Sequence, residues 1–89
     1  MIETRTWTIE VVLTEDDGRT RADAVLHTAA QGQLRGQGRA RRNPADTYVP
    51  EIGDEIAASR ALSDLAHKLL DTAAGTIEAT THKPAHLRA

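Results

Sequence analysis

The sequence predicts one α+β domain of 89 residues, in which a three-stranded antiparallel sheet is followed by one long C-terminal helix (β-β-β-α). Three observations predict this fold. Residues 6–14 alternate between apolar and polar side chains, Asp17-Gly18 is a two-residue turn signal, and apolar residues recur at helical spacing from Ile56 to Ile77. Aromatic residues make up 2% of the chain, so a thin core must come from aliphatic side chains and Trp7.

The first two strands are expected over about residues 6–14 and 19–28, as a hairpin. With Asp17 and Gly18 as the loop, apolar residues oppose one another on one face, and a slip of one residue would destroy this sorting. The apolar pairs are Leu13–Ala22, Val11–Ala24 and Ile9–Leu26. The pairs on the other face are Thr14–Arg21, Val12–Asp23, Glu10–Val25 and Thr8–His27.

The third strand is expected over about residues 34–42, between a loop at 29–33 and the NPAD turn at 43–46. One of its faces is almost bare and continues the apolar face of the hairpin. Glycine weakens a strand unless another backbone has to approach closely. The bare face is therefore predicted to be the bed on which the helix lies. Its members are Leu34, Gly36, Gly38 and Ala40, beside Ala22 and Ala24.

The helix is expected over about residues 52–78. Pro50 and Asp54 are candidate start signals, Gly75 or about Thr80 marks the end, and residues 79–89 form a tail. At about 40 Å the helix is longer than strands of about 25–30 Å. Its distal apolar residues therefore need another partner, and a homodimer is the simplest one. The predicted dimer interface consists of Leu69, Leu70, Ala73 and Ile77.

The opposite side of the helix carries charges of both signs. The simplest interpretation is pairing between residues four apart, as in Arg60–Asp64 and His67–Asp71. This interpretation makes the polar side an ordinary solvated surface.

The net charge of −2 conceals a strong segregation, because residues 19–42 hold six arginines and one aspartate between acidic flanks. Arginine binds phosphate bidentately, so this region predicts contact with RNA or the ribosome. The face lacks an aromatic residue that would stack a base, which argues against a reader of single strands. The alternative is an ordinary sheet face that Glu10 and Asp23 neutralise. The candidate contacts are Arg35, Arg39, Arg41 and Arg42, with Arg21 and Lys68 behind them.

The remaining motifs do not indicate catalysis or metal binding. His82 and His86 flank Pro84 and have no third ligand, and Ser59 and Ser63 have no base placed beside them. We therefore expect no enzymatic activity, metal, cofactor or small-molecule substrate. The sequence has no cysteine, no signal peptide and no apolar run long enough to cross a bilayer, which predicts a cytoplasmic protein without membrane contact.

Five blocks of the sequence resemble a family of small actinobacterial proteins of formerly unknown function. The blocks are TRADAVL (20–26), GxGxARxNPAD (36–46), VPEIGDE (49–55), RALSDL (60–65) and IEATTHKPAHL (77–87). The resemblance runs from about Trp7 to Leu87. It implies a fold like that of double-stranded-RNA-binding domains. The best-known member is a mycobacterial protein induced in hypoxia and dormancy, which forms a homodimer and is similar in shape to ribosome hibernation-promoting factors.

Together these observations predict a non-enzymatic stress or dormancy protein that binds the ribosome or structured RNA. The alternative is a homodimeric protein-interaction or structural module without RNA binding. In both cases the sheet would be completed by dimerisation.

Overall fold

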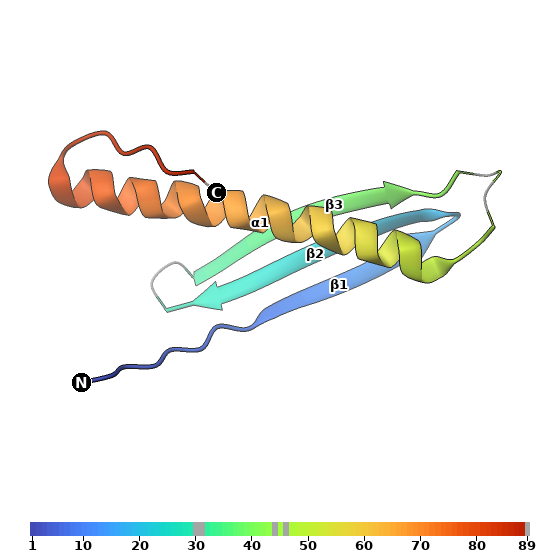
Figure 1. Cartoon of the computed structure of the whole chain (residues 1–89), viewed down its shortest axis with the longest axis horizontal. Helices are drawn as coiled ribbons and strands as arrows, with labels where there is room; N and C mark the ends of the chain where they lie inside the picture. Colours follow the sequence, from blue (N-terminus) through green and yellow to red (C-terminus); the bar gives the residue numbers. More distant parts are fainter. Residues whose placement is uncertain (30–31, 44, 46, 89) are drawn as a thin grey trace.

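The fold is the predicted three-stranded antiparallel sheet with one long helix across a single face (Figure 1). A computed structural model describes residues 1–29, 32–43, 45 and 47–88. The strands are β1 (Ile9–Asp16), β2 (Arg19–Thr28) and β3 (Gly32–Arg41), in the spatial order β1-β2-β3, and the helix is α1 (Pro50–Thr81). The loop expected at 29–33 and the turn expected at 43–46 lie partly outside the described residues.

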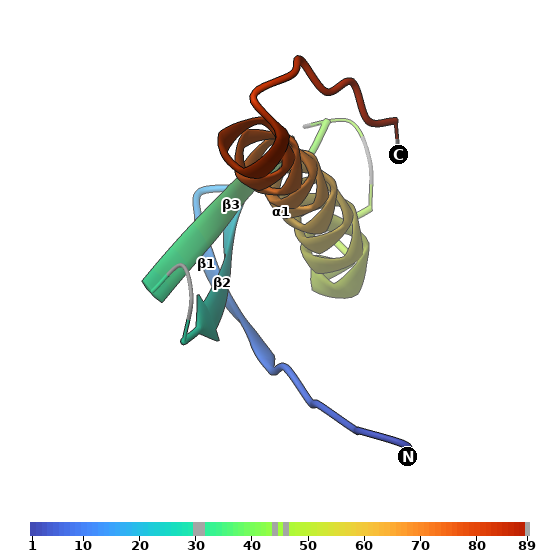
Figure 2. The same ribbon diagram turned by 90° about the vertical axis from the view of Figure 1, so that its left-hand side faces the viewer.

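The β1–β2 hairpin has the register that the apolar alternation predicts, from Ile9↔Leu26 to Asp16↔Arg19. Asp17 and Gly18 both have positive φ, 50° and 74°, which is the conformation of a tight two-residue hairpin turn. The expected Thr8–His27 pair is wrong, because the ladder begins at Ile9 and residues 1–8 leave the sheet as an extended segment (Figure 2). Strand β1 therefore runs from residue 9 to 16 and not from 6 to 14.

Strand β3 begins two residues earlier and ends one residue earlier than expected. Gly32, at a φ of 69°, opens the strand opposite Thr28. At the other end Arg42 leaves the β2–β3 ladder, and its backbone N–H donates to the carbonyl of Gly18 at 2.8 Å. The chain is therefore fastened to the hairpin turn before it crosses to α1.

The glycines of β3 allow α1 to approach the sheet backbone to backbone, as predicted. A methyl group added at Gly36 would overlap the carbonyl oxygen of Ala61, and one added at Gly38 would overlap the carbonyl oxygen of Ala57. The contact is thus made by residues with small or no side chains. The buried cluster consists of Ala22, Ala24, Leu26, Ala40, Ala57, Ala61 and Leu65.

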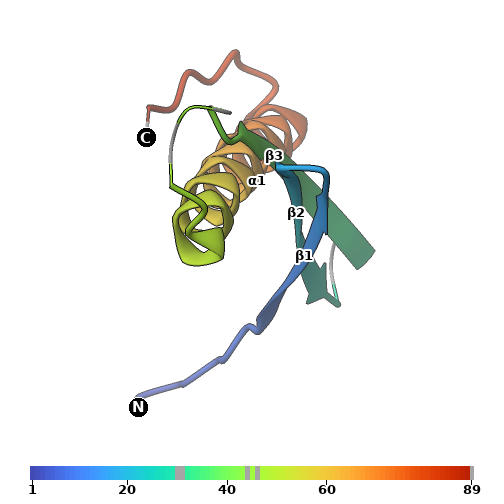
Figure 3. The same cartoon turned by 90° about the vertical axis from the view of Figure 1, so that its right-hand side faces the viewer.

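The expected core is wrong in two respects. Trp7 is 60% exposed, because residues 1–8 extend away from the sheet. On the helix, the buried positions are Ala57, Ala61 and Leu65, whereas Ile56 and Leu62 face solvent. Where the helix backbone approaches the glycines of β3, Ala57 and Ala61 face the sheet, and Leu65 is buried beside Gly36. As Figure 3 shows, α1 lies over β2 and β3, and it makes few contacts with β1.

Helix α1 is longer than expected, at 32 residues or about 48 Å. Pro50 lies in its first turn, and His82 ends it in the left-handed conformation with φ 60°, its N–H donating to the carbonyl of Glu78. Gly75 does not end the helix, so the longer of the two predicted ends is the correct one. The distal turns project beyond the strands (Figure 1). In the described part of the chain, no helix is long and apolar enough to cross a membrane.

Candidate nucleic-acid interface

Four arginines stand together on the sheet face that points away from α1. Residues alternate between the two faces of a strand, so Arg19 and Arg21 of β2 share the outer face with Arg39 and Arg41 of β3. The register places Arg19 directly opposite Arg41 and Arg21 directly opposite Arg39. We call these four residues the arginine tetrad. It forms a quadrilateral whose corners are about 5 Å apart across the strands and about 7 Å apart along them.

The tetrad lines a shallow depression together with Thr14 and Asp16 of β1. Like charges directly opposite one another on adjacent strands destabilise a sheet. Two such pairs in succession therefore weaken the sheet to the extent that Asp16, Asp23 or a bound anion does not neutralise them.

Neutralisation of the tetrad by the protein itself is incomplete. Asp23 forms an ion pair with Arg21 at 3.2 Å, and the hydrogen bond from Arg21 lowers the pKa of this carboxyl group. Within the described residues, no carboxylate forms an ion pair with Arg19, Arg39 or Arg41. Glu10, the second expected neutralising residue, likewise has no arginine partner there. Three of the four guanidinium groups are therefore available to an external anion.

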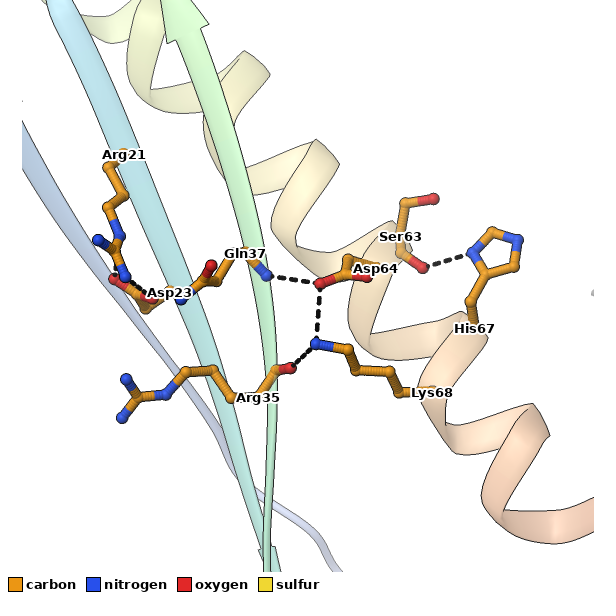
Figure 4. A network of polar contacts seen from close by, with 8 residues as sticks. All are labelled: Arg21, Asp23, Arg35, Gln37, Ser63, Asp64, His67 and Lys68. Carbon is orange, nitrogen blue, oxygen red and sulfur yellow. Dashed lines mark hydrogen bonds and ion pairs between the residues drawn. The ribbon is translucent and has the colours of Figure 1, made fainter. Parts of the chain in front are cut away.

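Arg35 shares the outer face but lies apart from the tetrad. It stands opposite Val25, and the pair Asp23↔Gln37 separates it from Arg21 and Arg39. In Figure 4 its side chain leaves the sheet on the same side as Arg21 and away from α1. Arg35 extends the positive face along β3 without joining the cluster.

Two predicted contacts, Arg42 and Lys68, are not brought to this face. The guanidinium carbon of Arg42 lies 5.2 Å from the ring centre of Tyr48, in the segment that leads to α1. Tyr48 in turn donates its hydroxyl to Glu15 at 2.6 Å, which raises the pKa of the tyrosine. Lys68 Nζ donates to the carbonyl oxygen of Arg35 at 2.6 Å and so lies against the rim of β3.

The sequence interpretation omitted Arg19, which the structure places in the tetrad. A signal for it was present. If Thr14 opposes Arg21, then Asp16 opposes Arg19, and the two arginines are two residues apart on one strand and must share a face. The missing information was the register of β3, which puts Arg41 opposite Arg19.

The polar side of α1 covers the outer edge of β3. Pairing between residues four apart occurs, but between Asp64 and Lys68, and the expected Arg60–Asp64 pair does not form in the described structure. Arg60 Nη1 donates to the carbonyl of Arg39 at 2.7 Å. Asp64 accepts the backbone N–H of Gln37 at 2.9 Å and pairs with Lys68 at 3.2 Å (Figure 4). Together with the hydrogen bond from Lys68 to the carbonyl of Arg35, these contacts occupy backbone groups of β3 that point away from β2.

His67 also has a partner other than the expected one. Its Nδ1 lies 2.8 Å from the carbonyl oxygen of Ser63, and not beside Asp71. Elsewhere in the described chain, no three His, Asp or Glu side chains are grouped so as to hold a metal ion.

Comparison with known proteins gives consistent matches over almost the whole chain. The model of the Rv2632c-like family matches residues 5–86. Uncharacterized protein MT1780 of Mycobacterium tuberculosis is 49% identical over 81 residues, which cover 91% of this chain and 85% of that protein. Uncharacterized protein Rv2632c of the same organism is 50% identical over 80 residues, covering 90% and 85%. The crystal structure of Rv2632c superposes with a TM-score of 0.84 at 48% identity, covering 93% of this chain and 98% of that one.

Proposed function

This chain belongs to the Rv2632c-like family, and we propose that it is a non-enzymatic cytoplasmic protein that binds structured RNA, with ribosomal RNA as the favoured partner. The observation that carries the proposal is the arginine tetrad. Its two like-charged pairs, Arg19↔Arg41 and Arg21↔Arg39, oppose folding in the free protein and become favourable when phosphates lie between them.

The other side chains on the outer face of the sheet indicate which kind of nucleic acid the arginines would bind. The outer-face positions of the three strands carry no Phe, Tyr or Trp, since Trp7 precedes β1 and Tyr48 lies next to α1. Unstacked bases are usually held on aromatic rings, whereas duplex RNA is bound through phosphates and shape. A flat sheet face with guanidinium groups at about 5–7 Å spacing suits the backbone of a duplex or of a folded ribosomal RNA.

A role in stress or dormancy, with action like that of hibernation-promoting factors, belongs to the same proposal. Its support is the resemblance of the five sequence blocks. The mechanism would be electrostatic occupancy of a site on the ribosome. The overall charge of −2 does not oppose this mechanism, because the acidic residues lie mostly outside the region from residue 19 to 42.

Co-sedimentation with ribosomes, combined with a salt titration, tests the proposal. We expect binding at low salt that is lost in the double variant Arg19→Glu/Arg41→Glu. The double variant Lys83→Glu/Arg88→Glu is a matched control, because it makes the same change in net charge in the C-terminal tail. If four phosphates are contacted, log K should fall with log salt with a slope of about −3 to −4. No binding by the unmodified chain at low salt, or equal loss in both double variants, would contradict the proposal.

A second candidate function is a homodimeric interaction or structural module without RNA binding. One observation favours it: the radius of gyration is 16.8 Å, whereas a compact domain of this length has about 12 Å. Among the four predicted interface residues, Ala73 and Ile77 are exposed on the projecting end of α1, and Leu69 and Leu70 are half-buried. Dimers that form regardless of salt and ignore RNA at low salt would favour this candidate over the first.

A further inference from the structure

The sheet face on which α1 lies changes from apolar to polar in its last row. The register sets Glu15, Thr20 and Ala40 side by side across β1, β2 and β3, at the end nearest the hairpin turn. The three preceding rows of this face are Leu13-Ala22-Gly38, Val11-Ala24-Gly36 and Ile9-Leu26-Leu34. A core face that continued to this end would carry apolar side chains here as well. The last row therefore presents hydrogen-bonding groups beneath the start of α1.

A cavity of about 170 Å³ lies between this polar row and the first two turns of α1. Ile52, Gly53 and Ile56 of the helix line one side of it, and Arg42 and Tyr48 line it as well. The cavity is partly open to solvent. An apolar cavity of about 150 Å³ holds one benzene ring, whereas pockets for drug-sized ligands begin at about 300 Å³. The size of this cavity therefore suits a single six-membered ring.

Thr20 presents an unpaired hydroxyl group to this cavity. The residue is 5% exposed, and in the part of the chain that the structure describes no hydrogen bond reaches its side chain. Its Oγ1 stands beside the backbone of Gly53, 2.9 Å from where a methyl group added at that glycine would lie. A hydroxyl group that is removed from bulk water without a partner costs free energy. A ligand that forms a hydrogen bond with Thr20 would recover this cost.

Glu15 provides a hydrogen-bond acceptor in the same row. Its carboxylate accepts the hydroxyl of Tyr48 at 2.6 Å, and Glu15 also lines the cavity. A carboxylate has about four lone-pair positions and no proton to donate, so it can accept a further N–H group. A ligand of this cavity therefore needs an N–H group toward Glu15, an acceptor toward Thr20 and an apolar body toward α1.

We propose that the cavity binds a cytosine base. Cytosine is a single planar ring with apolar faces, its amino group donates to carboxylates, and its remaining ring acceptors can bind a hydroxyl group. The amino group would point toward Glu15 and an acceptor toward Thr20, with the ring against α1. Uracil has a carbonyl oxygen in place of the amino group, and this oxygen would meet the lone pairs of the carboxylate. A purine has a second ring, for which the cavity is too small.

The charged residues of the cavity indicate that the base is carried by a nucleotide. Arg41 and Arg42 line the cavity, and guanidinium groups bind phosphate. Ribose and phosphate would remain outside, at the open side. Two sources carry this chemistry, free cytidine monophosphate and an unpaired cytidine of an RNA. Binding of the free nucleotide is independent of the proposed function, whereas binding of an RNA residue rests on it.

Titration of the unmodified chain with cytidine monophosphate and with uridine monophosphate, followed through the backbone amide resonances, tests the proposal. Cytidine monophosphate should shift the resonances of Thr20 and Gly53. Its affinity should be about 10-fold higher than that of uridine monophosphate, as expected for one well-made contact to a base edge. Equal affinities would overturn the proposal. Shifts confined to the arginine tetrad would also overturn it, because they would report attraction of the phosphate alone.

Thr20→Val tests the role of the hydroxyl group, because valine keeps the shape of the side chain and removes the hydrogen bond. This variant should bind cytidine monophosphate about 10-fold more weakly. Thr8→Val is the matched control, since Thr8 is exposed before β1 and has no contact in the described structure. Circular dichroism shows whether both variants are folded. Unchanged affinity in folded Thr20→Val would overturn the proposal, and the comparison of the two nucleotides requires no variant.

Two RNA hairpins that differ only in one unpaired residue, cytidine or uridine, separate the two sources. Tighter binding of the cytidine hairpin, lost in Thr20→Val, would assign the cavity to a base of RNA. Equal binding of both hairpins, with cytidine monophosphate still bound, would assign it to the free nucleotide. A fully paired duplex should bind Thr20→Val as it binds the unmodified chain. The duplex therefore tests the arginine tetrad separately, and failure of the proposed function is distinguished from failure of the cavity.

Discussion

The carboxylate of Asp64 accepts the backbone N–H of Gln37 at 2.9 Å, across the boundary between α1 and the outer edge of β3. With Arg60 and Lys68 on either side, it occupies hydrogen-bonding groups that would otherwise be open to another strand. Charged side chains that look like solvated surface decoration thus close one edge of the sheet. Among the described residues, the edge that α1 leaves open is that of β1.

A fall in pH should weaken the contact of Asp64 with the edge of β3, because the pKa of Asp64 is lowered in the folded protein. The hydrogen bond from Gln37 and then the ion pair with Lys68 lower this pKa below its ordinary value of 3.8. A carboxyl group whose pKa falls on folding stabilises the protein above its unfolded pKa, and this stabilisation is lost as the pH falls through the folded value. Asp64→Asn should therefore lower Tm at neutral pH, and the difference from the unmodified chain should shrink below pH 3.8.

Thermal unfolding at a series of pH values, with amide exchange at Gln37, checks this expectation. Asp71→Asn is the matched control, because Asp71 is an exposed carboxyl group on the same helix without a contact in the described structure. Faster exchange at Gln37 in the Asp64 variant alone is expected. Equal Tm values for the two variants at neutral pH would contradict a role of Asp64 in closing the edge.

The close contact between α1 and the glycines of β3 leads to a second prediction. Gly38→Ala would press a methyl group into the backbone of α1 at Ala57 and Ala61, and overpacking of this kind costs about 1–3 kcal/mol of unfolding free energy. Gly75→Ala should instead stabilise by about 0.5–1 kcal/mol, because it lies inside the helix with no atom within 4 Å of the added methyl group. Denaturant unfolding of both variants measures the two opposite shifts. Equal shifts would show that α1 does not rest on β3 as described.

The fold could be predicted from the sequence wherever a local pattern determines it. The alternation around Asp17-Gly18 admits one register, and Gly36 and Gly38 have little reason to occupy a strand unless a helix backbone lies against them. The exposure of Ile9 could not be predicted in this way. Alternation assigns a side chain to a face, but it does not say how many strands a helix will cover.

The candidate site was predictable in part for the same reason. The shared face of Arg35, Arg39 and Arg41 follows from spacing within one strand, whereas membership of Arg19 depends on the register between two strands. The position of Lys68 depends on the angle at which α1 crosses the sheet, which sets which helix residues meet the edge of β3. No local pattern encodes that angle.

The opposed arginines predict that stability and RNA binding change in opposite directions. Arg41→Thr removes one like-charged cross-strand pair and places a β-branched residue in the strand, so it should raise the unfolding free energy by about 0.2–1 kcal/mol. The same change should weaken RNA binding and reduce the magnitude of the salt slope by about 1. Denaturant unfolding and a salt titration on one preparation measure both quantities. A variant that is less stable and binds RNA unchanged would contradict a ligand role for the tetrad.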